Sequence, residues 1–253
     1  MQMLNYKWMW RGVFGALVLS VGTALCAQDE YLSEEDLYGE DVVNGSGVSD
    51  PLESVNRVIF KFNDFVYLQL VDRVGAVYTA VTPDPVEEAA TNFFYNLKYP
   101  VRLAGNLLQG RLKGAWIETE RFALNTTAGV AGIMRPADQF ERMAPLPSED
   151  VGQALGSWGI GEGPYLVLPL LGPSNLRDLF GLVGDRAANP LQKPFSLIED
   201  WEWEEQTALT VSELIVNTPS VVQRYKQMKG SAIDPYGSLK NGYTQYRRAA
   251  VEE

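Results

Sequence analysis

A glycine- and proline-rich apolar segment, Gly156–Gly181, constrains the fold of this chain more than any other stretch. Glycine allows backbone conformations that other residues avoid, whereas proline fixes φ and removes a hydrogen-bond donor. We therefore expect irregular backbone here, shaped around something apolar, and neither an ordinary amphipathic helix nor a long regular strand. The residues that punctuate the segment are Gly156, Gly159, Gly161, Gly163, Pro164, Pro169, Gly172 and Pro173.

A short apolar run near the amino terminus indicates that the chain is exported. Lys7 and Arg11 precede an apolar stretch from Gly12 to about Leu25, which small and polar residues follow. These three features are typical of a secretory signal peptide. The run is too short for a membrane-spanning helix, which needs roughly 20 apolar residues. We therefore predict a signal peptide over residues 1–27.

The signal peptide has two possible ends. Cys26 stands where a bacterial lipoprotein signal places its acylated cysteine, although Leu25 and Thr23 replace the small and aliphatic residues of that pattern. Ordinary cleavage after Ala27 is the competing interpretation. A single acyl chain gives only marginal membrane binding, so a chain acylated at Cys26 would still need a second membrane contact.

The residue types that are missing exclude much enzymatic chemistry. The chain has no histidine and a single cysteine. It therefore cannot hold a Ser-His-Asp or Cys-His nucleophilic system, a histidine-containing metal site, an intrachain disulfide or a cysteine cluster. Its formal net charge of −11 disfavours nucleic acid as a partner. We expect no catalytic residue, no metal and no cofactor, and only carboxylate chemistry survives as an enzymatic alternative.

Punctuation and periodicity predict a mostly α-helical body. Residues 28–49 are acidic and contain Gly and Ser, which indicates a flexible linker, and residues 50–253 form the folded domain with a polar C-terminal tail. The Asp-Pro pairs at residues 50–51 and 234–235 predict helix starts with Asp as the N-cap. Other predicted helices start near Pro85 and cover residues 101–108, 112–125, 176–188 and 201–229, the last interrupted near Pro219.

The first predicted helix interleaves polar and aromatic residues. Asn56, Arg57 and Asn63 alternate with Phe60 and Phe62. Such a pattern suits either the wall of a wet passage or a solvated helix face, and the spacing alone favours the solvated face. The apolar residues that recur at helical spacing are Val55, Ile59, Phe62 and Val66.

The glycine cluster and the charged residues each allow a plain structural interpretation. GxGxxG after a strand and GxxxxGK[ST] are both absent, which favours a structural loop, with room for a lipid or a moving gate as the alternative. Arg121, Arg177 and Asp178 suit either buried pairs that position helices or surface salt bridges of little energetic value. Nothing in the spacing of Glu149 and Asp150 marks an acid/base couple.

Several aromatic-rich amphipathic helices, none long enough to span a bilayer, suit a protein that lies in one membrane leaflet. Trp116, Trp158, Trp201 and Trp203 suit either an interfacial belt or the core. Together with the export signal, these features point to a lipid as the ligand.

Four strings carry a family resemblance. They are DPLESVNRVIFKFND, GNLLQGRLKGA…RFALNTTAGVAGI, DVGQALGSWGIGEGPYLVLPLLGPSNLRD and DPYGSLKNGYTQYR, in this order between Asp50 and Arg248. The chain thereby closely resembles the VacJ/MlaA family, outer-membrane proteins, typically lipoproteins, of the system that maintains lipid asymmetry in Gram-negative bacteria. The pattern GxGxGPYxxLPxxGPxxxRD is specific to that resemblance.

The resemblance implies a fold, a function and partners. It implies a ring of amphipathic helices in the periplasmic leaflet of the outer membrane, around a central channel for phospholipid headgroups. Mislocalised outer-leaflet phospholipids would pass through the channel to a soluble periplasmic lipid carrier (MlaC-like) that an inner-membrane ABC-type complex serves. A trimeric porin would be the outer-membrane scaffold.

Positions that match the family motifs are the candidate channel or gate residues, with core packing as the alternative for each. Two other functions remain open: an adaptor that tethers a porin to the carrier without a channel, and a phospholipase that uses carboxylates. The candidates are Asn56, Arg57, Phe60, Phe62 and Asn63 in the first helix, Gly159, Gly161, Gly163, Pro164 and Tyr165 in the glycine-rich loop, and Arg177 with Asp178.

Overall fold

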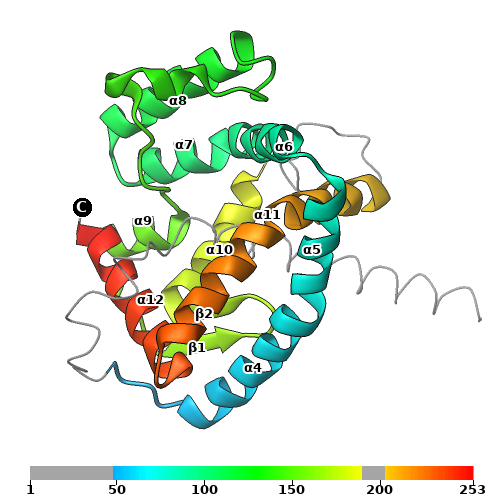
Figure 1. The fold of residues 1–253 in the computed structure, drawn as a ribbon. Helices are drawn as coiled ribbons and strands as arrows, with labels where there is room; N and C mark the ends of the chain where they lie inside the picture. Colours follow the sequence, from blue (N-terminus) through cyan, green and yellow to red (C-terminus); the bar gives the residue numbers. More distant parts are fainter. Residues whose placement is uncertain (1–47, 190–202, 253) are drawn as a thin grey trace, which may run out of the picture.

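The structure, a computed structural model, describes residues 48–189 and 203–252. The predicted signal peptide, Cys26, most of the predicted linker and Trp201 lie outside the described residues. The described chain is mostly helical, as predicted, with a single two-stranded sheet among these residues (Figure 1). Its helices are α4 (Glu53–Val66), α5 (Asp72–Val81), α6 (Asp84–Leu97), α7 (Tyr99–Leu108), α8 (Leu112–Thr127), α9 (Val151–Ser157), α10 (Leu176–Ala188), α11 (Trp203–Ser231) and α12 (Pro235–Glu252).

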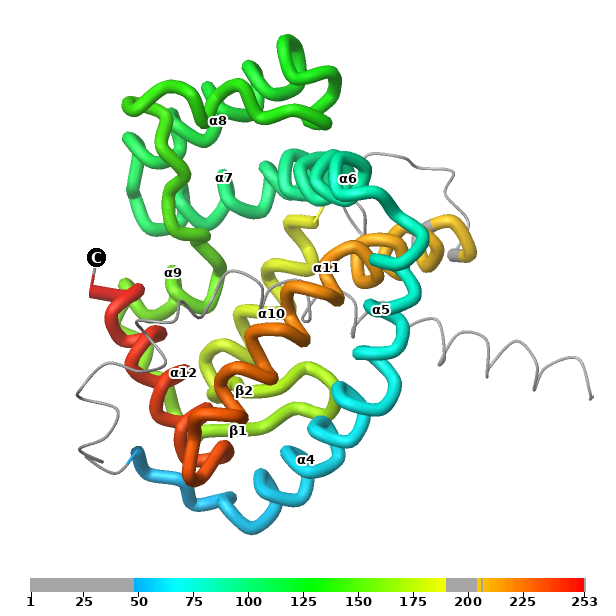
Figure 2. The backbone as a smooth tube through the Cα atoms, viewed as in Figure 1, coloured from blue at the N-terminus to red at the C-terminus, as the bar shows by residue number. Residues whose placement is uncertain are grey.

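The helices α4 and α5 form one continuous element through the π-helical segment η1 (Tyr67–Val71). Figure 2 shows this element along one border of the molecule, where α5 lies beside α11. At the opposite end, α7 packs against α8, and the short 3-10 turns η2 (Pro136–Gln139) and η3 (Glu141–Met143) pack beside α8. The molecule therefore has a long-helix region around the sheet and a smaller group of helices at one end.

The glycine- and proline-rich segment is more regular than the sequence suggested. Its first residues end α9, and its middle forms the antiparallel strands β1 (Tyr165–Leu168) and β2 (Gly172–Asn175). In the register of this hairpin, Tyr165 lies opposite Asn175 and Leu168 opposite Gly172. The prediction of irregular backbone is wrong over these eight positions. Pro169 lies just beyond the end of β1, and Pro173 lies in β2, which is an edge strand and tolerates a residue without an N–H donor.

Two predicted helix boundaries need correction. Asp50 does not cap α4, which begins at Glu53 without a side-chain cap. The Asp50 carboxylate instead accepts hydrogen bonds from Asn56 and Tyr236. The predicted interruption at Pro219 is also absent, because α11 continues through this residue. Proline removes one backbone donor, and packing of α5 against α11 compensates for that loss.

The second Asp-Pro pair behaves as predicted. The helix α12 begins at Pro235, and the Asp234 carboxylate accepts backbone hydrogen bonds from Tyr236 and Gly237. These acceptors satisfy donors that every helix start leaves open. The two Asp-Pro pairs thus have the same sequence and different local roles.

The polarity of α4 is inverted relative to a helix of an ordinary water-soluble fold. On α4, Asn56 and Asn63 are 2% and 3% exposed, whereas Val58 is 67% exposed. The prediction that these asparagines lie on a solvated face is therefore wrong. The π-helical segment adds one residue to its turn, which keeps the exposed apolar side chains in one continuous row. The exposed members of this row are Val55, Val58, Phe62, Phe65, Leu70, Val74, Val77 and Val81.

Candidate functional site

Two asparagine amides on α4 hold the hairpin. Asn56 Nδ2 donates to the Tyr165 carbonyl at 3.0 Å, and Asn56 Oδ1 accepts from Val167 N at 2.9 Å. Asn63, two helical turns later, donates to the Leu168 carbonyl at 2.9 Å and accepts from Leu170 N at 2.7 Å. Each amide takes the place of a neighbouring strand, so the backbone groups of the β1 edge are satisfied in the interior.

The turn of the hairpin is strained and depends on these contacts. Leu170 has φ +65°, which is unfavourable for a branched side chain. Asn63 accepts from its backbone N–H, and the Tyr67 hydroxyl donates to its carbonyl at 2.8 Å. Such strain persists only where the surroundings determine the conformation, and here α4 and η1 supply both partners.

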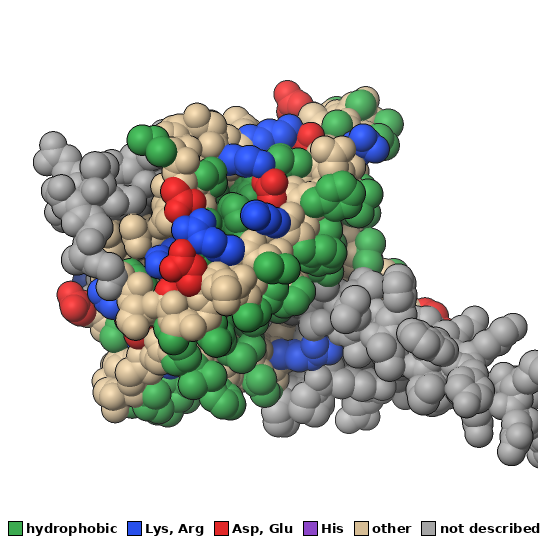
Figure 3. All heavy atoms as spheres, turned by 90° about the horizontal axis from the view of Figure 1, so that it is seen from below, with side chains coloured by type: hydrophobic (Ala, Val, Ile, Leu, Met, Phe, Trp, Pro, Cys, Tyr) green, Lys and Arg blue, Asp and Glu red, His purple; other side chains and the backbone are tan. Residues whose placement is uncertain are grey.

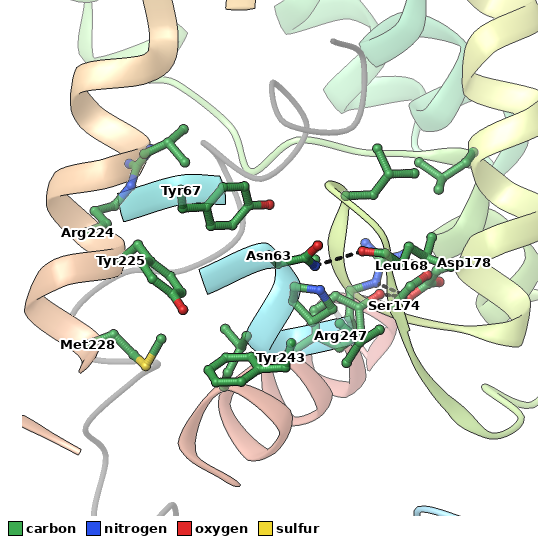
Figure 4. Close-up of a pocket in the computed structure, with 18 of the residues that line it drawn as sticks. Asn63, Tyr67, Leu168, Ser174, Asp178, Arg224, Tyr225, Met228, Tyr243 and Arg247 are labelled. Atoms are coloured by element: carbon green, nitrogen blue, oxygen red, sulfur yellow. Dashed lines mark hydrogen bonds and ion pairs between the residues drawn. The ribbon is translucent and has the colours of Figure 1, made fainter. Parts of the chain in front are cut away.

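A cavity of about 110 Å³ opens beside the hairpin. This volume is well above the roughly 10–15 Å³ that one water molecule needs. The lining comes from α4, η1, both strands, α10, α11 and α12, and Figure 4 shows Asn63, Tyr67, Tyr225 and Met228 around it. Its walls are apolar at Phe60, Tyr67, Val167, Leu168, Leu171, Pro173, Leu182, Val221, Tyr225, Met228, Leu239 and Tyr243, and polar at Asn63, Asp150, Ser174, Asp178, Asp185, Arg224 and Arg247.

The polar side of the cavity centres on Arg247, which is 2% exposed. Its guanidinium donates to Asp150 Oδ2 at 2.5 Å and Oδ1 at 3.0 Å, and to both oxygens of Asp178 at 2.7 Å. Tyr243 donates to Asp178 Oδ2 at 2.6 Å. Desolvation lowers the pKa of Arg247, but the charges of Asp150 and Asp178 and the hydrogen bond to Asp150 outweigh desolvation and raise the pKa overall. The arginine therefore stays charged and holds two carboxylates together.

A third carboxyl group, Asp185 on α10, also lines the cavity. Its Oδ1 accepts from Val151 N at 2.8 Å. Burial raises the pKa of this carboxyl well above its ordinary value, and the charge of Asp150 raises it further. Asp185 therefore carries a proton under conditions in which an exposed aspartate is ionised.

Glycines allow this polar cluster to form. A Cβ atom on Gly181 of α10 would lie 2.5 Å from Gly152 N of α9, a distance that real Cβ atoms do not show. The two helices can approach this closely only without side chains there. The contact brings Asp178 and Asp185, on α10, beside Asp150 at the start of α9.

The structure places only three of the twelve predicted channel or gate residues on the cavity wall: Phe60, Asn63 and Asp178. Tyr165 and Asn56 lie behind the wall, where Asn56 anchors β1. Arg177 is buried and pairs with Asp178 at 3.2 Å, so the buried-pair interpretation is confirmed.

The other predicted residues lie elsewhere on the molecule. Arg57 pairs on the surface with Glu53 at 2.7 Å and with Asp234 at 2.9 Å. Phe62 belongs to the exposed apolar row of α4. Four predicted residues lie in the glycine-rich loop and do not line the cavity: Gly159, Gly161, Gly163 and Pro164.

Sequence reasoning missed most of the polar wall. Arg247 is not among the candidate residues that the sequence offers, yet it is buried in ion pairs. Asp150 was left without a role, although it caps Gln153 N at 2.7 Å. The spacing of these residues carries no signal, since 97 positions separate Arg247 from Asp150. The missed residues of the polar wall are Asp150, Ser174, Asp185, Arg224 and Arg247.

Apolar side chains gather on the outside of the molecule near the cavity. Figure 3 shows them over one part of the face seen from below, beside a hollow that acidic and basic side chains border. Trp116 and Trp158 are also exposed, at 65% and 57%. Within residues 48–189 and 203–252, no helix combines the length and apolar character that crossing a membrane requires. The same residues contain no group of acidic or cysteine side chains arranged to hold a metal ion.

Comparison with known proteins finds relatives in the MlaA lipoprotein family. The profile of the MlaA lipoprotein family matches residues 48–250. A protein of unassigned function from Rickettsia bellii is 31% identical over 88% of this chain and 86% of its own length. The intermembrane phospholipid transport system lipoprotein MlaA of Haemophilus influenzae is 27% identical over 81% of this chain and 80% of its own. Its namesake in Escherichia coli K12 is 34% identical over 55% and 56%, respectively.

A solved structure has a similar fold. It comes from work described as the structural basis for maintenance of bacterial outer membrane lipid asymmetry. Its chain superposes with a TM-score of 0.66 at 27% identity, over 81% of this chain and all of that chain.

Proposed function

Because this chain belongs to the MlaA lipoprotein family, we propose that it is the outer-membrane component of an intermembrane phospholipid transport system. It removes mislocalised phospholipids from the outer leaflet and passes them to a soluble periplasmic lipid carrier (MlaC-like), which maintains lipid asymmetry. The observation that carries this proposal is the inverted polarity of α4, with an exposed apolar row on the outside and, on the inside, a cavity whose wall is charged on one side.

The apolar exterior supports placement in the periplasmic leaflet of the outer membrane. Fully burying one Val or Phe side chain contributes about 1.5–3 kcal/mol, and α4, η1 and α5 expose eight such apolar side chains in a row. A helix with this pattern lies along a bilayer interface. The helices form a ring around a central channel, and a trimeric porin serves as the scaffold in the membrane.

The cavity supports passage of a headgroup. A polar group that crosses hydrocarbon without a partner costs several kcal/mol. The polar wall with Asp178, Asp185 and Arg247 offers such partners, while the apolar wall with Tyr67 and Met228 suits the part of the lipid nearest the headgroup. Acyl chains stay in the membrane, and the transfer needs no covalent step.

The predicted site residues divide between wall and gate in this proposal. Phe60, Asn63 and Asp178 form part of the wall, and Asn56 and Arg177 hold its supports. Phe62 faces lipid, and Arg57 ties α4 to the start of α12. The loop of Gly159, Gly161, Gly163 and Pro164, which leads into the hairpin at Tyr165, acts as the mobile gate.

A deletion strain tests the proposal. Loss of the chain should raise the amount of phospholipid in the outer leaflet, measured by surface labelling of lipid amines. The wild-type chain and Ile233→Trp should restore asymmetry, since Ile233 is fully exposed away from the cavity wall. Leu182→Trp, which fills the cavity, should be produced normally but should not restore it. Full restoration by Leu182→Trp would favour an adaptor without a channel.

A further inference from the structure

The three carboxyl groups of the cavity differ in how completely they are bonded. Both oxygens of Asp150 and both of Asp178 accept hydrogen bonds from Arg247. Asp185 accepts one hydrogen bond, from Val151 N at its Oδ1. Among the described residues, no donor reaches Asp185 Oδ2. One oxygen at the edge of a built polar network is therefore open.

The fold holds Asp185 in place at the cavity wall. A Cβ atom on Gly184 would already lie 2.7 Å from the Val151 side chain, so α10 and α9 are in tight contact beside Asp185. The hydrogen bond from Val151 N then fixes the orientation of the carboxyl group. A side chain fixed at one oxygen presents the other in a constant direction, which is what a binding contact needs.

We propose that Asp185 Oδ2 carries the proton that hydrogen-bonds to a phosphate oxygen of a phospholipid headgroup in the cavity. This inference rests on the proposed function, because it assigns the lipid contact of the same cavity. A phosphate diester offers only acceptors, so an ionised carboxylate would repel it, whereas a carboxylic acid donates to it. Hydrogen bonds between a neutral acid and an anionic oxygen are short and strong.

The surrounding charges favour this protonation state. From α9, the ionised Asp150 raises the pKa of Asp185, in addition to burial, which is the larger cause. On α10 itself Asp178 raises it, and from α12 Arg247 lowers it. Tyr243 on α12 bonds to Asp178, and Arg102 on α7, which also packs near α10, pairs with Glu118.

The formal charge of the cluster changes with this single proton. Arg247 pairs with Asp150 and Asp178, and Arg177 pairs with Asp178, so two arginines and two carboxylates balance when Asp185 is neutral. Ionisation of Asp185 adds a negative charge to this cluster and removes the donor. We therefore expect phosphate binding at low pH and its loss as the pH rises through the raised pKa of Asp185.

The test is binding of dihexanoyl-phosphatidylglycerol, a soluble short-chain probe, to the purified full chain in a phosphate-free maltoside detergent. Broadening of the ³¹P resonance gives the affinity across a pH series. Asp185→Leu should weaken binding roughly tenfold to a hundredfold, as expected for a hydrogen bond to a charged group. Asp185→Asn keeps a donor at every pH, so it should bind with an affinity that does not fall at high pH.

Controls separate the sources of the signal. Asp72→Asn removes a carboxylate from the surface of α5, where Asp72 pairs with Lys226, and should behave as wild type. Dihexanoylglycerol, which lacks phosphate, should not distinguish the variants. Inorganic phosphate should compete weakly; competition equal to that of the lipid would assign the site to free phosphate and overturn the lipid contact.

Two results would refute the role of Asp185 itself. One is wild-type affinity in Asp185→Leu, and the other is a wild-type affinity that stays constant at high pH. Because this assay measures binding without transport, its outcome is independent of the deletion strain. Normal asymmetry in that strain would contradict the proposed function, while the binding result would still decide whether Asp185 contacts phosphate.

Discussion

Asn56 Oδ1 accepts a hydrogen bond from Val167 N at 2.9 Å, across 111 positions of sequence. A side-chain amide on a helix thus replaces a neighbouring strand for the edge of a hairpin. Asn63 repeats the arrangement two turns later. These two amides, together with the apolar contacts of Ile59 and Phe60, dock α4 onto the sheet, and the opposite apolar side of the helix stays exposed.

Replacing Asn63 should therefore destabilise the fold. Asn63→Leu removes a donor from the Leu168 carbonyl and an acceptor from Leu170 N. An unsatisfied buried group costs about 1–3 kcal/mol, so we expect a loss of roughly 2–4 kcal/mol in the free energy of unfolding. Denaturant unfolding in detergent measures it, with Lys61→Ala, an exposed change on the same helix, as the control. Equal stability of both variants would refute the docking role of the amide.

Gly161 and Gly163 should respond differently to substitution. Gly163 has φ +70°, and a Cβ there would lie 2.9 Å from Leu176 Cβ. A non-glycine residue in this region costs about 1–2 kcal/mol, so Gly163→Ala should lower the melting temperature. Gly161 has no atom within 4 Å of such a Cβ. Gly161→Trp should therefore fold normally and, if the loop is the gate, slow lipid passage in the deletion strain. Normal passage in a folded Gly161→Trp would argue against the gate.

Charges placed in the exposed apolar row should weaken membrane binding without unfolding the chain. Val58 and Val77 are 67% and 65% exposed, so neither supports the core. Each Lys substitution removes apolar contact worth about 1.5–3 kcal/mol when fully buried in lipid. We expect roughly tenfold weaker sedimentation with phospholipid vesicles for Val58→Lys and for Val77→Lys. Gln227→Lys adds the same charge at an exposed position of α11 and should leave vesicle binding unchanged, whereas equal weakening by all three would indicate a general charge effect.

Asp185 should make stability depend on pH. Burial, and then the charge of Asp150, raise its pKa in the folded chain, so the folded chain binds this proton more tightly than the unfolded chain. The resulting stabilisation is complete below the ordinary aspartate pKa of about 4 and declines as pH rises through the raised value. Asp185→Asn cannot ionise, so its melting temperature should exceed that of wild type increasingly toward alkaline pH. A difference that does not vary with pH would contradict the raised pKa.

The mature amino terminus should carry an acylated Cys26. The chain belongs to a family of lipoproteins, and one acyl chain together with the apolar row would supply the two contacts that stable membrane attachment needs. Mass spectrometry of the mature protein should find a lipid-modified Cys26 as the first residue. A mature chain that begins at unmodified Gln28 would show instead that the folded body alone holds the protein at the membrane.

Much of the helical framework could be predicted because its signals are local. Helical periodicity and the Pro-Asp punctuation predicted α6 and α8 within two residues at their starts, and α10 at both ends. The hairpin was missed because its strands are only four residues long and contain Gly172 and Pro173. The continuity of α11 through Pro219 was missed because packing against α5 outweighs one lost backbone donor.

The residues of the cavity wall likewise include some that could be predicted from the sequence and some that could not. Phe60, Asn63 and Asp178 belong to motifs that mark a family, so they were found from the sequence. Asp150, Asp185 and Arg247 belong to three different helices or their caps, and their pairing depends on how α9, α10 and α12 pack. No spacing in the sequence encodes that packing.

By itself, the sequence determined the helical segments, the family resemblance and the exclusion of histidine-dependent chemistry, and it predicts an export signal. Tertiary structure alone decided which side of each helix is inside. Periodicity shows that α4 has a polar and an apolar side, but it does not show which of the two sides faces the interior. The hydrogen bonds of Asn56 and Asn63 to the hairpin turn the polar side inward, since buried amides are stable only where every polar group finds its partner.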